Sequence, residues 1–158
     1  MIRFARPLAL WAIAAASLAV ATPVQAQQGY QHRQYYGNWH AHNSGYSYRP
    51  YYFKPHAQFH GYRHHYVIHH PKDPRHLYFY NPYKKQFWGR CPVETGGKAL
   101  YSMLAEKDRA GDLEKIPESA FPEPGPLPTV PEATDGLKLD LPPDDLPDIS
   151  ALPGGEKK

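Results

Sequence analysis

Histidine side chains at alternating positions are the first residues of this chain with a capacity for chemistry. Positions 64–70 read His-His-Tyr-Val-Ile-His-His, and alternate residues of a strand share a face. In a strand, His65 and His69 lie on one side, with His64 and His70 on the other. Imidazole binds zinc, copper or nickel, so the pattern predicts weak transition-metal binding and no other cofactor. Structural zinc sites usually combine cysteine with histidine, and solvated histidines are the simpler interpretation.

A second group of residues combines basic side chains with aromatic rings. An aromatic ring can stack on a flat ligand while a neighbouring cation binds an anion. This combination predicts an interaction surface made of Tyr78, Trp88, Tyr83, Lys84, Lys85 and Arg90. The expected partner is an anionic cell-envelope polymer or a polysaccharide, since export argues against nucleic acid. The alternative is that the aromatic residues form the core of a small sheet with few aliphatic residues to bury.

The remaining polar residues do not form any of the common catalytic motifs. The sequence contains no glycine-rich phosphate loop, no nucleophile elbow and no His-Glu-x-x-His motif. Most acidic residues fall in the proline-rich C-terminal part, where a general acid or base would have no fixed geometry. The sequence therefore predicts a protein that is not an enzyme.

The stretch from His76 to Cys91 predicts a β-hairpin that would position the aromatic and basic residues. Two aromatic runs flank a connection that begins with Asn81-Pro82, a pair that favours a type I turn. If Asn81 pairs with Lys85, then Phe79 faces Phe87 across the ribbon. An isolated two-stranded hairpin is only marginally stable in water, so further strands are expected nearby.

Two neighbouring segments are candidates for those strands. The histidine-flanked segment 64–70 contains β-branched residues at its centre, and Pro71 ends it. On the other side, Gly96-Gly97 predicts a turn, and 99–103 is expected to return as a strand before a short helix over 105–110. A single helix over 99–110 is the alternative, because short apolar runs fit both periods.

The first 26 residues have the organisation of a secretory signal peptide. Arg3 and Arg6 precede an apolar run over 8–20, and the small-residue sequence Val24-Gln25-Ala26 follows. The apolar run is shorter than the 20 or so residues that span a bilayer, which argues against a membrane anchor. No later stretch is apolar enough to span a bilayer, so the mature chain is not expected to cross a membrane. We expect export to the periplasm, the cell envelope or the extracellular space.

Cys91 is the only cysteine and cannot form an internal disulfide. A thiol buried against the hairpin is one interpretation, because free cysteine is commonly buried. The other is a dimer linked through Cys91, since an odd cysteine in an exported protein is free to pair between chains.

Charge and composition divide the mature chain into unlike parts. Positions 27–92 contain nine Lys or Arg and one acidic residue, whereas 93–158 contain seven basic and fourteen acidic residues. Segment 27–63 is rich in Tyr, His and Gln with few aliphatic residues, and 122–158 is acidic and rich in proline. Both compositions predict disorder. The opposite charges predict a loose attraction between the two parts.

Parts of the sequence resemble known proteins. The run from Tyr78 to Asn81, followed by Trp88 and Pro92, is similar to the second half of a WW domain, a proline-binding three-stranded sheet. The interval from Asn81 to Trp88 is one residue shorter than in that pattern and the upstream tryptophan is missing. We therefore interpret the likeness as a convergent aromatic hairpin.

A second, broader resemblance implies no activity for this chain. The motifs Tyr80-Asn81-Pro82, 87–90 (Phe-Trp-Gly-Arg) and 116–122 (Ile-Pro-Glu-Ser-Ala-Phe-Pro) resemble those of small uncharacterised exported bacterial proteins with a Tyr/His-rich head and a proline-rich acidic tail. The expected fold is mainly β, a small antiparallel meander of three or four short strands with one short helix over 64–121. The expected function is an exported, non-enzymatic interaction or structural role, with weak metal binding as the alternative.

Overall fold

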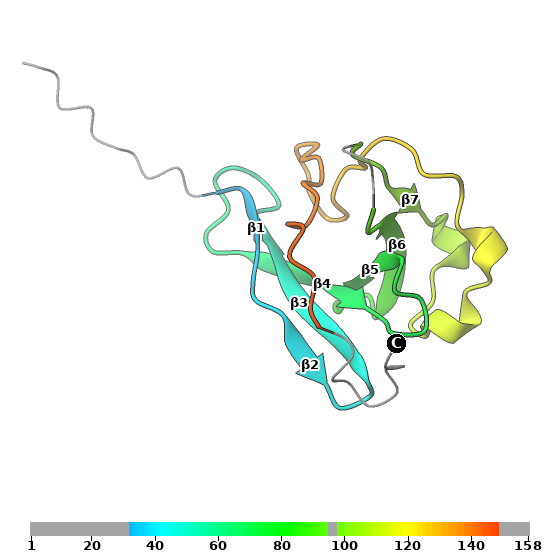
Figure 1. Cartoon of the computed structure of the whole chain (residues 1–158). Coiled ribbons are helices and arrows are strands. Elements are labelled where there is room, and N and C mark those ends of the chain that lie inside the picture. The colour runs from blue at the N-terminus through cyan, green and yellow to red at the C-terminus, as the bar shows by residue number, and fades with distance from the viewer. Residues whose placement is uncertain (1–31, 95–97, 149–158) are drawn as a thin grey trace, which may run out of the picture. The chain divides into compact units, whose positions relative to one another are not determined.

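The computed structural model describes residues 32–94 and 98–148, which form a mainly antiparallel β structure (Figure 1). The expected signal peptide, the Gly96-Gly97 turn and positions 149–158 lie outside the described residues. The strands are β1 (Gln34–Tyr36), β2 (His40–His42), β3 (Tyr46–Phe53), β4 (Arg63–His69), β5 (His76–Asn81), β6 (Gln86–Pro92) and β7 (Ser102–Met103). Within the described ranges, no helix has the length and apolar character needed to cross a membrane.

The strands form one antiparallel sheet in the order β1-β3-β4-β5-β6-β7, and β2 pairs with β3 beside β1. The mainly-β antiparallel prediction is confirmed. The sheet is larger than the expected three or four strands because positions 34–53 contribute three of its strands. In that part of the segment 27–63, the predicted disorder is therefore wrong.

The physical reason lies in strand β3. Its residues alternate strictly between half-buried and buried, with Ser47, Arg49, Tyr51 and Phe53 on the buried side. Two of these four are polar, so a search for apolar alternation misses the strand. Pro50 has no N–H to donate, so it cannot make a full set of hydrogen bonds to a neighbouring strand. It lies opposite the gap between β1 and β2, where its carbonyl accepts a hydrogen bond from the N–H of Gly37 (2.8 Å).

The predicted hairpin is present, but its register differs from the expected one. Asn81 pairs with Gln86 rather than Lys85, which makes Tyr80 the partner of Phe87, and a bulge between Phe79 and Tyr80 then makes Phe79 the partner of Gly89. The Asn81 side chain accepts hydrogen bonds from the backbone N–H groups of Tyr83 (2.9 Å) and Lys84 (3.1 Å), which fixes a four-residue turn. The bulge shifts every later residue of β6 relative to the simple register.

Each face of the sheet is covered by a different C-terminal segment. Residues 127–145, which we call the strap, cross one face, and their Val130 and Leu139 are buried in a core with Trp88 and Phe79. The described part of 122–158 is thus packed on the sheet through these two side chains, and the predicted disorder there is wrong. Burial of each aliphatic side chain contributes about 1.5–3 kcal/mol, which offsets part of the conformational entropy lost when the strap is ordered.

Residues 104–121, which we call the cover segment, lie on the other face. Leu104 and Ile116 are buried there against Tyr78 and Phe87. The cover segment contains three single 3₁₀ turns, η1 (Glu106–Asp108), η2 (Leu113–Lys115) and η3 (Glu118–Ala120), instead of the short α-helix expected over 105–110. Prolines at 117 and 122 and glycine at 111 interrupt any longer helix.

Candidate functional site

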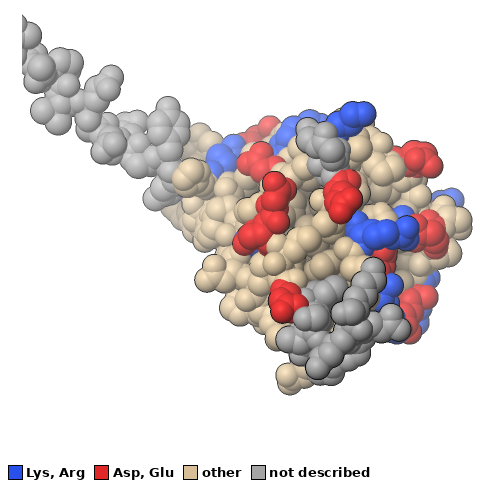
Figure 2. All heavy atoms as spheres, viewed as in Figure 1, with Lys and Arg blue, Asp and Glu red and all other residues tan. Residues whose placement is uncertain are grey.

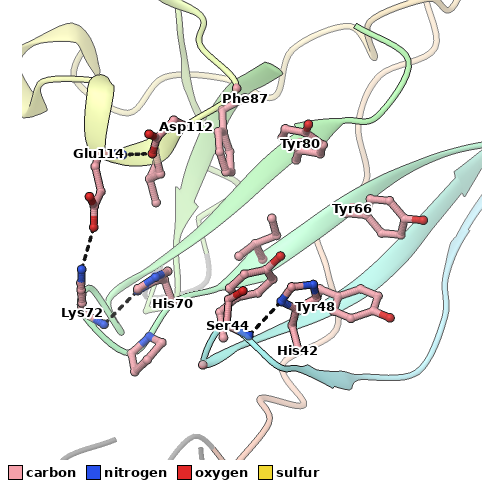
Figure 3. Close-up of a pocket in the computed structure, with 16 residues that line it drawn as sticks. His42, Ser44, Tyr48, Tyr66, His70, Lys72, Tyr80, Phe87, Asp112 and Glu114 are labelled. Atoms are coloured by element: carbon pink, nitrogen blue, oxygen red, sulfur yellow. Dashed lines mark hydrogen bonds and ion pairs between the residues drawn. The ribbon is translucent and has the colours of Figure 1, made fainter. Parts of the chain in front are cut away.

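A groove of about 760 Å³ opens on the face of the sheet that the cover segment leaves partly bare (Figure 3). Its floor is built from half-buried tyrosines of three neighbouring strands, Tyr46 and Tyr48 of β3, Tyr66 of β4 and Tyr80 of β5. Cavities of 300–1,000 Å³ with aromatic walls and a few polar groups are typical of ligand sites. We call this surface of four tyrosines the tyrosine face.

Sheet geometry places these rings together. Tyr66 pairs directly with Tyr80 across β4 and β5, while Tyr48 contacts Tyr66 edge to face with ring centroids 5.5 Å apart. His42 of β2 stacks on Tyr46, with centroids 4.4 Å apart. These residues share one face because side chains two positions apart on a strand point the same way. The result is a continuous aromatic surface assembled from separate strands.

The cover segment supplies one wall of the groove. Phe87 of β6 donates its backbone N–H to the carbonyl of Ala110 (2.8 Å), which holds the start of that wall against the sheet. Farther along, Glu114 accepts a hydrogen bond from Lys72 (2.7 Å), and this ion pair joins η2 to the turn after β4 (Figure 3). Both side chains of the pair are largely exposed, so the contact contributes little stability.

The polar groups of the groove are mostly neutral. Burial raises the pKa of Tyr46 and Tyr66 above 10, so their hydroxyls remain protonated at neutral pH. Burial, with the nearby charge of Lys72, lowers the pKa of His70 below 6.5, which favours the neutral imidazole. The floor of the groove therefore presents ring faces and phenolic hydroxyls beside the neutral His70 imidazole, while Lys72, Asp112 and Glu114 add charged groups to its lining.

The predicted interaction surface divides into buried and exposed residues. Trp88, Tyr78 and Arg90 are 0%, 4% and 6% exposed, so these three are core residues and the prediction of a surface role is wrong for them. Phe79 contacts Trp88 with ring centroids 5.0 Å apart, which shows that the aromatic rings of the hairpin build the core. Tyr83, which is 53% exposed, together with Lys84 and Lys85, remains on the surface.

Arg90 belongs to a polar network at the edge of the cover segment. Its guanidinium binds Glu118 (2.8 Å from Nη1) and lies 4.0 Å from the ring centre of Phe121. Beside it, Asp73 accepts hydrogen bonds from Tyr78 (2.6 Å) and from the ring of His76 (2.7 Å). Burial alone would raise the pKa of Asp73, but these hydrogen bonds lower it overall. The network anchors the cover segment to β5 and β6.

The four histidines alternate between the two faces of β4 as expected, but they do not form a cluster. His65 and His69 are buried on the strap side, and His69 donates from Nε2 to the carbonyl of Pro74 (3.0 Å). His64 lies beside Tyr83, and His70 lines the groove. Among the described residues, no three or more His, Cys, Asp or Glu side chains are placed to hold a metal ion. Weak metal binding stays a prediction that zinc or copper titration tests.

Opposite charges join the strap to the basic strands. Arg33 pairs with Asp135 (3.0 Å), and Arg49 pairs with Asp145 (2.8 Å) while its guanidinium lies 5.0 Å from the ring centre of Trp39. Figure 2 shows acidic and basic side chains interspersed with uncharged surface on the face that the strap crosses. The contacts have defined geometry, so the expectation of a loose attraction is wrong for this part of the chain.

Comparison with known proteins adds no relative: no family model, no curated protein and no solved structure matches the chain. The candidate site therefore depends on geometry alone. Sequence reasoning missed Tyr46 and Tyr48 because they lie in the segment that was expected to be disordered. The sequence signal that was available is the concentration of tyrosine and phenylalanine over 46–53, because aromatic residues are enriched in strands.

Proposed function

We propose that the protein is an exported, non-enzymatic binding protein of the cell envelope or extracellular space whose ligand is a polysaccharide held on the tyrosine face. The observation that carries this proposal is the groove itself, where Tyr48, Tyr66 and Tyr80 remain half-buried with no described segment over them. Aromatic residues that serve only as core are covered on both sides, as Trp88 is.

Sugar rings have the complementary chemistry. A pyranose has flat patches of C–H bonds that pack on an aromatic ring, and a rim of hydroxyls that both donate and accept hydrogen bonds. The groove offers tyrosine hydroxyls and the His70 imidazole at the edges of its apolar rings. Several rings in a row on adjacent strands suit a polymer, because successive sugars can each contact one ring.

Two further features support this interpretation. The first 26 residues have the pattern of a signal peptide, which would deliver the chain to compartments where polysaccharides are abundant. The acidic groups of the groove, Asp112 and Glu114, are exposed and paired with Lys115 (3.9 Å) and Lys72 (2.7 Å). A general acid for sugar hydrolysis is instead kept partly desolvated and opposite a second carboxyl group.

Affinity electrophoresis of the mature protein through gels containing xylan, dextran or polygalacturonate tests the proposal. At least one polymer should retard the protein, and Tyr48→Ala and Tyr66→Ala should each weaken that retardation by about tenfold, equivalent to about 1.4 kcal/mol. Phe59→Ala removes a half-buried aromatic ring outside the groove and serves as the matched control. Equal retardation of all four proteins, or retardation of none by any polymer, would exclude the tyrosine face as a glycan site.

A further inference from the structure

We propose that the bound polysaccharide is anionic and that Lys84 and Lys85, in the turn between β5 and β6, contact its acidic groups. This inference rests on the proposed function and adds a charge requirement to it. Both lysines are exposed at a position where the aromatic groove ends. The proposed ligand thus stacks on the tyrosine face and places carboxylates or phosphates over the turn.

The turn and the groove are adjoining parts of one surface. Tyr80 and Phe87 both line the groove, and the pair Asn81–Gln86 beyond them closes the turn that contains the lysines. Gly111 of the groove wall lies directly against the carbonyl of Lys85, since a Cβ added at Gly111 would be 2.6 Å from that oxygen. A chain leaving the groove along this wall therefore reaches the turn that carries the two lysines.

Aromatic contacts continue from the groove to the same turn. His64 contacts Tyr66 of the tyrosine face, with ring centroids 5.2 Å apart, and contacts Tyr83 of the turn at 5.7 Å. The Tyr83 ring is 53% exposed and lies within 5.8 Å of the Arg63 guanidinium. The surface therefore extends without a break from neutral rings to a basic end.

The backbone that carries the two lysines is held in a defined turn. The Asn81 side chain bonds two backbone N–H groups of the turn, and its amide donates to Glu132 of the strap (3.2 Å). Lys85 itself has a left-handed backbone, with φ of 51°. A non-glycine residue in that conformation persists where its surroundings determine it. Presentation from a rigid turn lowers the entropy lost when a ligand binds.

Charge pairing distinguishes these two lysines from the other cations near the groove. Lys72 pairs with Glu114, Lys115 with Asp112, and Arg63 with Glu132. Within the described residues, neither Lys84 nor Lys85 has an ion-pair partner. The site thus has an uncompensated positive end, and a polymer with negative groups complements it.

Polygalacturonate and its fully methyl-esterified form share one backbone and differ in charge, so they separate stacking from charge recognition. At low salt, the mature protein should bind polygalacturonate about tenfold or more tighter than the ester. Lys84→Gln/Lys85→Gln should lose most of this preference while keeping its affinity for the ester. Lys98→Gln/Lys107→Gln removes two exposed lysines outside the groove, is matched in charge, and should bind like the parent.

Other outcomes separate the two proposals. Equal binding of the acid and the ester, both weakened by Tyr66→Ala, would overturn the charge requirement and leave the glycan site standing. Equal losses in both double-lysine variants would overturn the assignment to the turn, because a general charge effect would then explain binding. Failure to bind either form or a neutral glycan such as xylan would overturn the proposed function itself. A single-stranded dT oligonucleotide that binds more tightly than polygalacturonate would make nucleic acid the ligand and overturn both.

Discussion

The imidazole Nε2 of His65 lies 3.8 Å from a carboxylate oxygen of Glu132, and this contact joins the middle of β4 to the strap. The His65 side chain is fully buried, and neither of its ring nitrogens has a hydrogen-bond partner among the described residues. Glu132 also accepts from Asn81 and Arg63, each at 3.2 Å, and its backbone is left-handed with φ of 72°. The strap is therefore fastened at a strained position by three side chains of the sheet.

The burial of His65 predicts a loss of stability on mild acidification. Burial lowers the pKa of His65 below 6.5, although Glu132 opposes that shift and the neighbours His64 and Arg63 reinforce it. Below pH 6.5 the unfolded chain takes up a proton that the folded chain binds less readily, so the free energy of unfolding should fall. Urea unfolding between pH 7.5 and 5.5 measures the slope, and His65→Gln should reduce it. His70 contributes in the same range, so the slope should not vanish.

Glu132 should make the stability depend on pH in a second, more acidic range. Interaction with His65 and hydrogen bonds from Asn81 and Arg63 lower its pKa to about 2. Its stabilisation is complete above pH 4.5 and is lost as the pH falls towards 2, because protonation removes the negative charge. Glu132→Gln should flatten the stability profile between pH 4.5 and 2.5. Asp144→Asn changes an exposed carboxylate farther along the chain, and a profile equally flattened by it would contradict this assignment.

Two leucines of the C-terminal part test whether the strap is structural. Leu139 is 1% exposed in the core, whereas Leu146 is 43% exposed. Leu139→Ala should cost about 2–5 kcal/mol through lost burial and a residual cavity, and Leu146→Ala should stay within about 0.5 kcal/mol of the parent. Thermal melting of both variants measures the difference. Similar melting temperatures would mean that the strap does not hold the sheet in solution.

Gly89 predicts a sharp steric effect inside β6. A Cβ at this position would lie 2.4 Å from a ring carbon of Tyr101 and 2.5 Å from the carbonyl oxygen of Ser102. Gly89→Ala should therefore destabilise the protein by about 1–3 kcal/mol, because both neighbours are buried and cannot move away. Gly125→Ala is the control, since a Cβ there meets nothing within 4 Å. Denaturant titration of the two alanine variants should separate them clearly.

Cys91 should be unreactive in the folded protein. Its side chain is 2% exposed, and burial raises the pKa of the thiol to about 12, so little thiolate is present at pH 8. This burial favours the buried-thiol interpretation and leaves no surface thiol for a dimer linked through Cys91. Reaction with an aromatic disulfide reagent should be about 100-fold slower or more without urea than in 8 M urea, since labelling requires opening of the core. Rapid native labelling, or a dimer that reductant dissociates, would contradict it.

Local patterns in the sequence predicted the centre of the sheet. The β-branched residues at 67 and 68, the aromatic runs of β5 and β6 and the Asn81-Pro82 turn all act over a few residues, so they can be recognised without knowledge of the fold. The hairpin register could not be predicted in the same way. It depends on the four-residue turn, which places Asn81 opposite Gln86, and on the bulge between Phe79 and Tyr80, which places Phe79 opposite Gly89.

The sequence by itself determined the antiparallel β class, the hairpin, the expected export signal and the separation of basic from acidic residues. Only the tertiary structure decided that 34–53 forms strands, because the buried side of β3 contains the polar residues Ser47 and Arg49, and Arg49 pairs with the distant Asp145. It also decided the role of the strap, where Val130 and Leu139 are isolated among prolines and become core residues only against the sheet. The tyrosine face has the same origin, since its rings come from three strands that only long-range pairing brings together.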